Sequence, residues 1–146
     1  RIVGHAPTKT QRDLVETAIE LVDVVCGAIR PGLLAREVQA IGAAFLAHSP
    51  VVRSLPPEEG ETEGFPAVGH GIGLATHELP GLGKRSSDAP LPRRTVFSVE
   101  PGIYIPEEGF AVRIENDIEP PGFGRMVRLI MMVSMERGKT LSGNAM

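Results

Sequence analysis

The chain has 146 residues, of which 42% are hydrophobic and 23% charged, an ordinary composition for one globular domain with its own core. Its formal net charge of -3 leaves no basic surplus to neutralise phosphates, which argues against a nucleic-acid partner. No apolar run approaches the roughly 18 residues that a membrane-spanning helix needs, and we see no signal-peptide pattern. The single cysteine, Cys26, cannot form an internal disulfide. Together these features predict a cytoplasmic protein without a membrane partner.

Two helices are predicted in the first third of the chain. Thr8 and Gln11 form a capping-box pattern, so the first helix should begin near Lys9. It should end at Arg30-Pro31-Gly32, because the residue before a proline is driven out of the helical region. A second helix is expected from about Leu34 to Ala47. The apolar positions at helical spacing are Leu14, Ala18, Leu21, Val25 and Ala28 in the first helix and Leu34, Val38, Ile41 and Phe45 in the second.

The remainder of the chain is predicted to be loop and sheet. Residues Ser49 to Gly64 combine prolines with a run of glutamates and show no periodicity, so we expect an exposed loop there. Short β-forming runs predict strands at Val96–Glu100, Ile103–Ile105, Ala111–Ile118 and Val127–Met135. Two helices followed by strands, without an internal repeat, predict an α+β domain in which the helices pack on one face of a curved antiparallel sheet.

The segment from Gly69 to Pro80 is the first that indicates chemistry. Three glycines within five residues surround His70, which favours a tight, irregular turn from which the imidazole projects. His77 follows seven residues later with Glu78 beside it, so two imidazoles and a carboxylate could converge on one cleft. A structural histidine that is satisfied by local hydrogen bonds explains either position equally well at this point.

Two glutamates lie within apolar strand patterns further along the chain. Glu100 and Glu115 would each cost several kcal/mol to bury without a partner, so a cation should face each of them. Pro101 restricts Glu100 to extended geometry, and Arg113 shares a strand face with Glu115. The competing interpretation is an ion pair without catalytic meaning, either between Arg113 and Glu115 or between neighbouring strands.

Taken together, His70, Glu100 and Glu115 are a suitable ligand set for divalent ions of intermediate hardness such as Mn, Co, Fe or Zn. Carboxylates that bridge can hold two ions at once. Such a pair of ions can activate a water molecule and polarise a scissile carbonyl. The combination therefore favours a metal-dependent hydrolase over isolated structural side chains.

The three motifs resemble the pita-bread metallopeptidase family, which includes Xaa-Pro dipeptidases, aminopeptidase P and methionine aminopeptidases. The resemblance rests on His-Gly-Ile-Gly-Leu, His-Glu-x-Pro, Glu-Pro-Gly-x-Tyr and Val-Arg-Ile-Glu in this order. It implies that His70, Glu100 and Glu115 are ligands of two divalent metal ions, with Glu115 bridging them. It also implies that His77 contacts the substrate or stabilises the transition state, and that Arg113 orients groups near the metals. Glu-Pro-Gly-Ile-Tyr and the short interval between the glutamates are more like the Xaa-Pro branch.

Two features of the chain depart from the family pattern. The family also uses two aspartate ligands upstream of the first long helix, and no aspartate of this chain stands at a matching position. Pro66 occupies a position where Xaa-Pro enzymes usually carry histidine. We therefore expect residues 1–146 to be the C-terminal part of one catalytic domain, with a fold incomplete at the N-terminus and no normal activity by themselves.

The resemblance implies a metal-dependent exopeptidase that acts on a peptide or a small amide, and it leaves a homodimer open. Two other functions remain as alternatives. The first is a non-catalytic member of the same fold that binds peptides or proteins, against which the retention of the histidines and glutamates argues. The second is a metal-independent amidinohydrolase that resembles creatinase.

Overall fold

The structure, a computed structural model, describes residues 6–54, 67–83, 86, 88–105, 110–119 and 127–134, the last of these for the backbone only. Helix α1 spans Lys9–Ala28 and begins at the predicted capping box. The Thr8 hydroxyl accepts from the Gln11 amide at 3.1 Å, and the Gln11 side chain accepts from the Thr8 amide at 2.9 Å. The helix ends before Gly32, whose φ of 89° is a conformation that glycine adopts without steric cost.

Helix α2 spans Ala35–His48, close to the predicted limits of Leu34 and Ala47. Leu34 is its N-cap, and the Glu37 side chain accepts from the Leu34 amide at 2.9 Å. The loop predicted from Ser49 to Gly64 is wrong at its beginning, because Pro50–Arg53 form a short helix, α3, and Ser49 is buried. Proline at the first helical position lacks only an amide that would have no helical partner. Residues 55–66 of the predicted loop lie outside the described residues.

The described strands form one antiparallel sheet, as predicted. Its members are β1 (Ala67–Ile72), β2 (Glu78–Gly83), β3 (Val96–Val99), β4 (Gly102–Ile105), β5 (Phe110–Ile118) and β6 (Val127–Ser134). The order is β2-β1-β3-β5-β4, and β6 pairs with the other edge of β5. The four predicted strands are confirmed to within one residue at each end. Strands β1 and β2 were not predicted, because glycine and proline have low β-propensity and the glycines indicated a turn.

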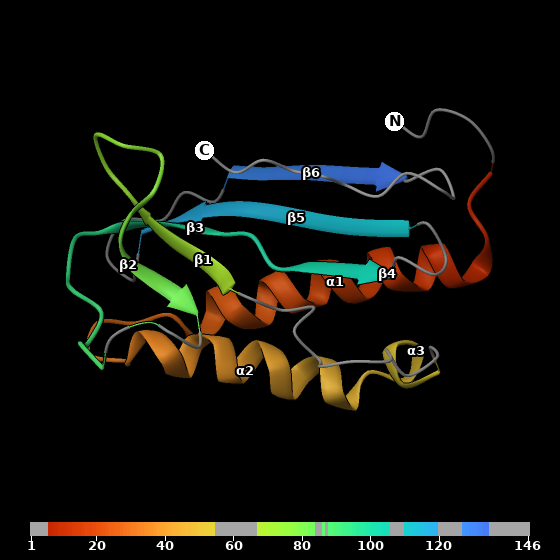
Figure 1. Cartoon of the computed structure of the whole chain (residues 1–146), viewed down its shortest axis with the longest axis horizontal. Helices are drawn as coiled ribbons and strands as arrows, with labels where there is room; N and C mark the ends of the chain where they lie inside the picture. The colour runs from red at the N-terminus through yellow and green to blue at the C-terminus, as the bar shows by residue number, and fades with distance from the viewer. Residues whose placement is uncertain are drawn as a thin grey trace.

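Helices α1 and α2 lie side by side on one face of the sheet (Figure 1), which confirms the predicted α+β architecture. Two apolar clusters fill the interface, one under β1, β2 and β3 and the other under β4 and β5. Cys26 is half-buried and packs against both clusters. The fully buried members of the clusters include Leu21, Val25, Val38, Phe97, Val112 and Ile114. A large aliphatic side chain buried in this way contributes about 1.5–3 kcal/mol relative to an exposed one.

Candidate functional site

Strand alternation separates the polar side chains of β5 from its core residues. Val112 and Ile114 are fully buried in the cluster that contacts α1. Successive side chains of a strand point to opposite faces, so Arg113, Glu115 and Asp117 project from the face of the sheet that the helices do not cover. The candidate site therefore forms on the open face of the sheet.

A break between β3 and β4 brings Glu100 to the same region. Both strands pair with the same edge of β5, and the register passes from Val99 opposite Asn116 to Gly102 opposite Arg113. Glu100 and Pro101 occupy the interval between the two strands, opposite the middle of β5. The proline that separates the strands thus places Glu100 next to Glu115.

A bulge in β1 turns His70 toward the open face. Val68 is buried in the core, and a regular strand would point His70 in the same direction. Instead, the pairing with β2 shifts register between Ala67 and His70, a type of irregularity that re-aims a side chain. His70 then lies opposite Ser98 of β3, and Ser98 lies opposite Asp117 of β5.

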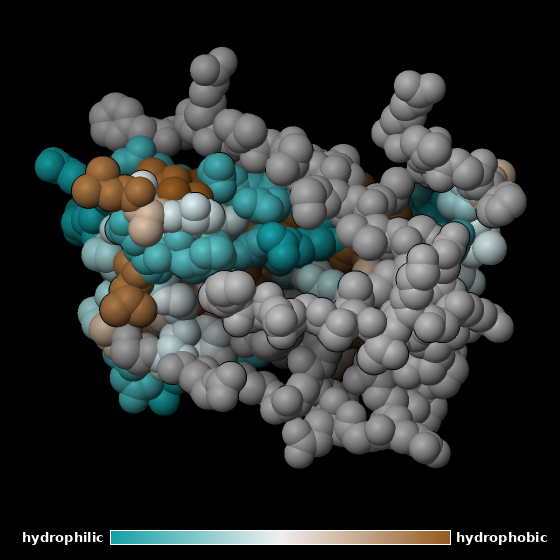
Figure 2. Space-filling view, turned by 45° about the horizontal axis from the view of Figure 1, so that its top comes forward, coloured by the Kyte–Doolittle hydropathy of each residue, from teal (hydrophilic) through white to brown (hydrophobic). Residues whose placement is uncertain are grey.

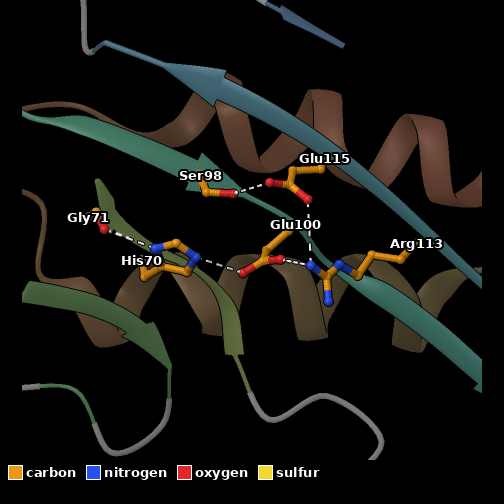
Figure 3. Close-up of polar contacts among 6 residues, drawn as sticks. All are labelled: His70, Gly71, Ser98, Glu100, Arg113 and Glu115. Carbon is orange, nitrogen blue, oxygen red and sulfur yellow. Dashed lines mark hydrogen bonds and ion pairs between the residues drawn. The ribbon is translucent and has the colours of Figure 1, made fainter. Parts of the chain in front are cut away.

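These side chains form one continuous network (Figure 3). His70 Nε2 lies 3.0 Å from Glu100 Oε1, and the other oxygen of Glu100 forms an ion pair with Arg113 Nη2. The same Arg113 nitrogen lies 3.5 Å from Glu115 Oε2. Ser98 donates to Glu115 Oε1 at 3.2 Å. The structure therefore brings together His70, Glu100, Arg113 and Glu115, four of the five predicted site residues, in direct contacts.

The second nitrogen of His70 determines what the imidazole can bind. Nδ1 lies 2.9 Å from the Gly71 carbonyl oxygen, which only accepts, so Nδ1 carries a hydrogen. In a neutral imidazole, Nε2 then presents its lone pair to the Glu100 carboxylate, which is also an acceptor. Both side chains are only 14% exposed, so a positive charge at this contact would stabilise the Glu100 carboxylate.

Arg113 supplies the positive charge between the two glutamates. Burial of its guanidinium by itself lowers its pKa, but the charge of Glu100 and a hydrogen bond with Tyr104 outweigh that effect, and the pKa is raised above its ordinary value. Arg113 therefore stays charged at any pH at which the protein is folded. Its Nε atom is buried and has no hydrogen-bond partner within the part of the chain that the structure describes. This Nε–H can serve a group that the described residues do not provide.

His77, the fifth predicted site residue, lies at the exposed rim of the same site. Its ring centroid is 4.3 Å from that of His70, at an interplanar angle of 46°. Ligand atoms of His70, His77 and Glu100 lie within 4.8 Å of one another, close enough to hold one ion. Glu115 does not belong to this group of three among the described residues, because its carboxylate is turned toward Ser98 and Arg113. The geometry alone thus permits His77 as a ligand, whereas the sequence resemblance implies that it contacts the substrate.

Three side chains take part in ways that the sequence analysis did not identify. Ser98 holds the orientation of Glu115, and its position two residues before Glu100 in extended chain could have indicated this role. Tyr104 of β4 is one of the groups that raise the pKa of Arg113. The Oδ1 atom of Asp117 is buried without a hydrogen-bond partner in the described segments, beside Ser98. The carboxylate of Glu78, which the sequence allowed to converge with the two imidazoles, accepts from the Ala75 amide at 2.8 Å.

A separate hollow lies on the helical side of the molecule. Residues of α1, α2 and α3 line it, among them Asp13, Glu16, Phe45 and His48. No residue of the open-face network contributes to its lining. We therefore assign the chemistry to the open face of the sheet and not to this hollow.

The glycine at the bulge should not tolerate a side chain. A Cβ on Gly69 would overlap the Ser98 carbonyl oxygen and lie 3.2 Å from the Val99 Cα atom, and backbone atoms of a paired strand cannot easily move aside. We expect Gly69→Ala to lower the free energy of unfolding of the full-length protein by about 1–3 kcal/mol in urea denaturation. Gly27→Ala is the matched control, because a Cβ there meets nothing within 4 Å and alanine is the better helix former. Equal unfolding midpoints for the two variants would contradict the close approach.

The comparisons with known proteins give the class of protein to which this α+β scaffold belongs. The model of metallopeptidase family M24 matches residues 2–119, and the chain belongs to this family. An Xaa-Pro dipeptidase from Pyrococcus furiosus is 33% identical over 118 residues, which cover 80% of this chain and 30% of that protein. An Xaa-Pro dipeptidase from Lactobacillus helveticus is 37% identical over 112 residues, covering 75% of this chain and 27% of that protein.

Solved structures support the same fold. The structure of an Xaa-Pro dipeptidase from Bacillus anthracis matches with a TM-score of 0.66 and 34% identity, covering 88% of this chain and 32% of that one. The predicted pita-bread fold is confirmed for the part of it that this chain covers. The chain spans about a third or less of the length of these relatives. Within the described residues, no helix has both the length and the apolar character needed to cross a membrane.

Proposed function

We propose that residues 1–146 form the C-terminal part of a single metallopeptidase catalytic domain, in which His70, Glu100 and Glu115 are ligands of two divalent ions. The full-length protein would hydrolyse a peptide bond near the substrate N-terminus, in the manner of an Xaa-Pro dipeptidase or aminopeptidase. The observation that carries this proposal is the largely buried contact of 3.0 Å between His70 Nε2 and Glu100 Oε1, which places an imidazole nitrogen and a carboxylate oxygen where one cation could bind both. The family of the chain and the names of its relatives support it.

The donor set fits Mn, Co, Zn or Fe, since it combines one imidazole with carboxylates. Bound ions would polarise the scissile carbonyl and activate a water molecule. The Gly71 carbonyl keeps the hydrogen of His70 on Nδ1, so that Nε2 is free to bind a cation. Ser98 orients Glu115 through the hydrogen bond of 3.2 Å. Arg113 balances the charge of both glutamates, and this keeps their carboxylates together before any ion is bound.

The exposed rim is the place where the substrate would meet the site. His77 lies there against His70 and can donate a hydrogen bond to the oxygen on which negative charge develops. The unpartnered Nε–H of Arg113 is a second donor for a substrate or for an upstream residue. Proline at the second substrate position is the expected preference of the Xaa-Pro branch. This chain has Pro66 where those enzymes usually carry histidine, so its preference for proline could differ from theirs. A cytoplasmic location and a homodimer remain predictions.

Metal dependence is the direct test of the proposal. We expect the full-length protein to bind Mn or Co and to hydrolyse Xaa-Pro dipeptides faster than Xaa-Ala dipeptides. A chelator should abolish the activity and added metal should restore it, while residues 1–146 alone should hydrolyse the dipeptides at no more than the background rate. The measurements are metal content by mass spectrometry and steady-state hydrolysis. Hydrolysis that survives complete metal removal would instead support the creatinase-like alternative, and metal binding without hydrolysis would support a binding protein.

A further inference from the structure

The loop between β1 and β2, residues 73–77, carries His77 but has little packing of its own. All five of its residues are exposed, and Leu74 is as exposed as in an extended peptide. Leu79, just beyond the loop, is 91% exposed, so the large apolar side chains beside His77 do not anchor it. Figure 2 shows that apolar side chains on this view of the molecule form only small, separate patches. An exposed loop with few buried contacts opens easily unless polar contacts hold it.

Glu78 provides such contacts. Its Oε1 accepts from the Ala75 amide at 2.8 Å, which ties the middle of the loop to the first residue of β2. Its carboxylate also lies directly over Gly73, where a Cβ would come within 2.7 Å of Oε1. Pairing of Glu78 with Gly71 fixes the backbone from which this side chain extends. The carboxylate of Glu78 therefore contacts both the beginning and the middle of the loop.

We infer that Glu78 is a positioning residue. Its carboxylate fixes the conformation of the 73–77 loop and thereby holds the ring centroid of His77 4.3 Å from that of His70. The inference rests on the proposed role of His77 toward the substrate. Glu78 acts through the oxygen that accepts the Ala75 amide hydrogen and not as an acid or base. It is also not a member of the group of described residues that could hold an ion, namely His70, His77 and Glu100.

Two substitutions at Glu78 separate these roles. Glu78→Gln keeps an acceptor oxygen for the Ala75 amide and removes the charge, so kcat should stay within about threefold of the parent protein. Glu78→Ala removes the acceptor, and loss of orientation at a reacting group lowers the rate by up to about 10²-fold. We expect kcat for an Xaa-Pro dipeptide to fall by about 10–100-fold in Glu78→Ala, with metal content unchanged. Glu20→Ala, at an exposed glutamate of α1, is the matched control and should behave like the parent.

A double variant tests whether the effect passes through His77. If it does, Glu78→Ala should cause no further loss of kcat in a protein that already carries His77→Ala. Gly73→Ala places a methyl group where the Glu78 carboxylate lies, and it should reproduce the effect of Glu78→Ala. Equal losses of kcat in Glu78→Gln and Glu78→Ala would overturn the inference, because they would show that the charge matters and not the acceptor. A full additional loss in the His77→Ala background would overturn it as well.

Hydrogen exchange provides a readout that does not depend on activity. At short labelling times, residues 73–78 of the full-length protein should exchange faster in Glu78→Ala than in Glu78→Gln or Glu20→Ala. If the protein showed no peptidase activity, the proposed function would fail while this exchange difference remained. If the protein were active and exchange of the loop were the same in all three variants, the inference that the Glu78 carboxylate fixes the 73–77 loop would be refuted.

Discussion

We expect His70→Ala in the full-length protein to lose bound metal and peptidase activity together. The substitution removes the imidazole whose Nε2 faces Glu100 at 3.0 Å, and among the described residues it leaves that largely buried carboxylate with Arg113 as its charged partner. Loss of an outer-shell partner of a metal ligand typically costs 10–100-fold in metal affinity or activity, and loss of the ligand itself should cost more than that. Metal content after gel filtration and kcat/KM for an Xaa-Pro dipeptide measure the two effects.

His48→Ala is the matched control for this prediction. His48 is an exposed histidine of α2 whose Nδ1 contacts the Ala44 carbonyl oxygen at 2.7 Å, and it lies on the helical side of the sheet. The control variant should keep its metal and its activity. A His70→Ala protein that retained a full complement of metal would show that His70 is not a ligand, and the site would have to be assigned again.

The second expected result concerns His77, whose replacement should separate catalysis from metal binding. In His77→Ala we expect metal content to stay intact and kcat to fall by about 10²–10³-fold, the usual effect of removing one hydrogen-bond donor to the transition state. KM should change much less, since the interaction forms mainly in the transition state. The structure makes this test demanding, because His70, His77 and Glu100 lie close enough to share an ion. Loss of one metal ion from His77→Ala would mean that this histidine is a ligand instead.

Much of the architecture could be predicted because its signals are local. The capping box at Thr8 lies within one turn, and the apolar residues of the first helix recur at the spacing of one turn. The four β-forming runs are short and bounded by proline or glycine. Residues 67–83 were misread for the opposite reason. Their glycines lower β-propensity, and the strands β1 and β2 exist because β1 finds hydrogen-bond partners in β2 and β3. Such pairing depends on residues that are distant in the sequence.

The candidate site divides in the same way. The sequence by itself singled out His70, Glu100 and Glu115 as candidates, because a histidine among glycines and two glutamates in apolar strands are costly arrangements without a partner. Only the tertiary structure decided how they meet. The bulge in β1 turns His70 to the open face, and the break at Pro101 sets Glu100 beside Glu115, with Arg113 between the two carboxylates. Tertiary structure also brought the Glu78 carboxylate onto the Ala75 amide. Side-chain direction in a sheet depends on register and on bulges, and a shift of one residue reverses it, so no local pattern could determine these contacts.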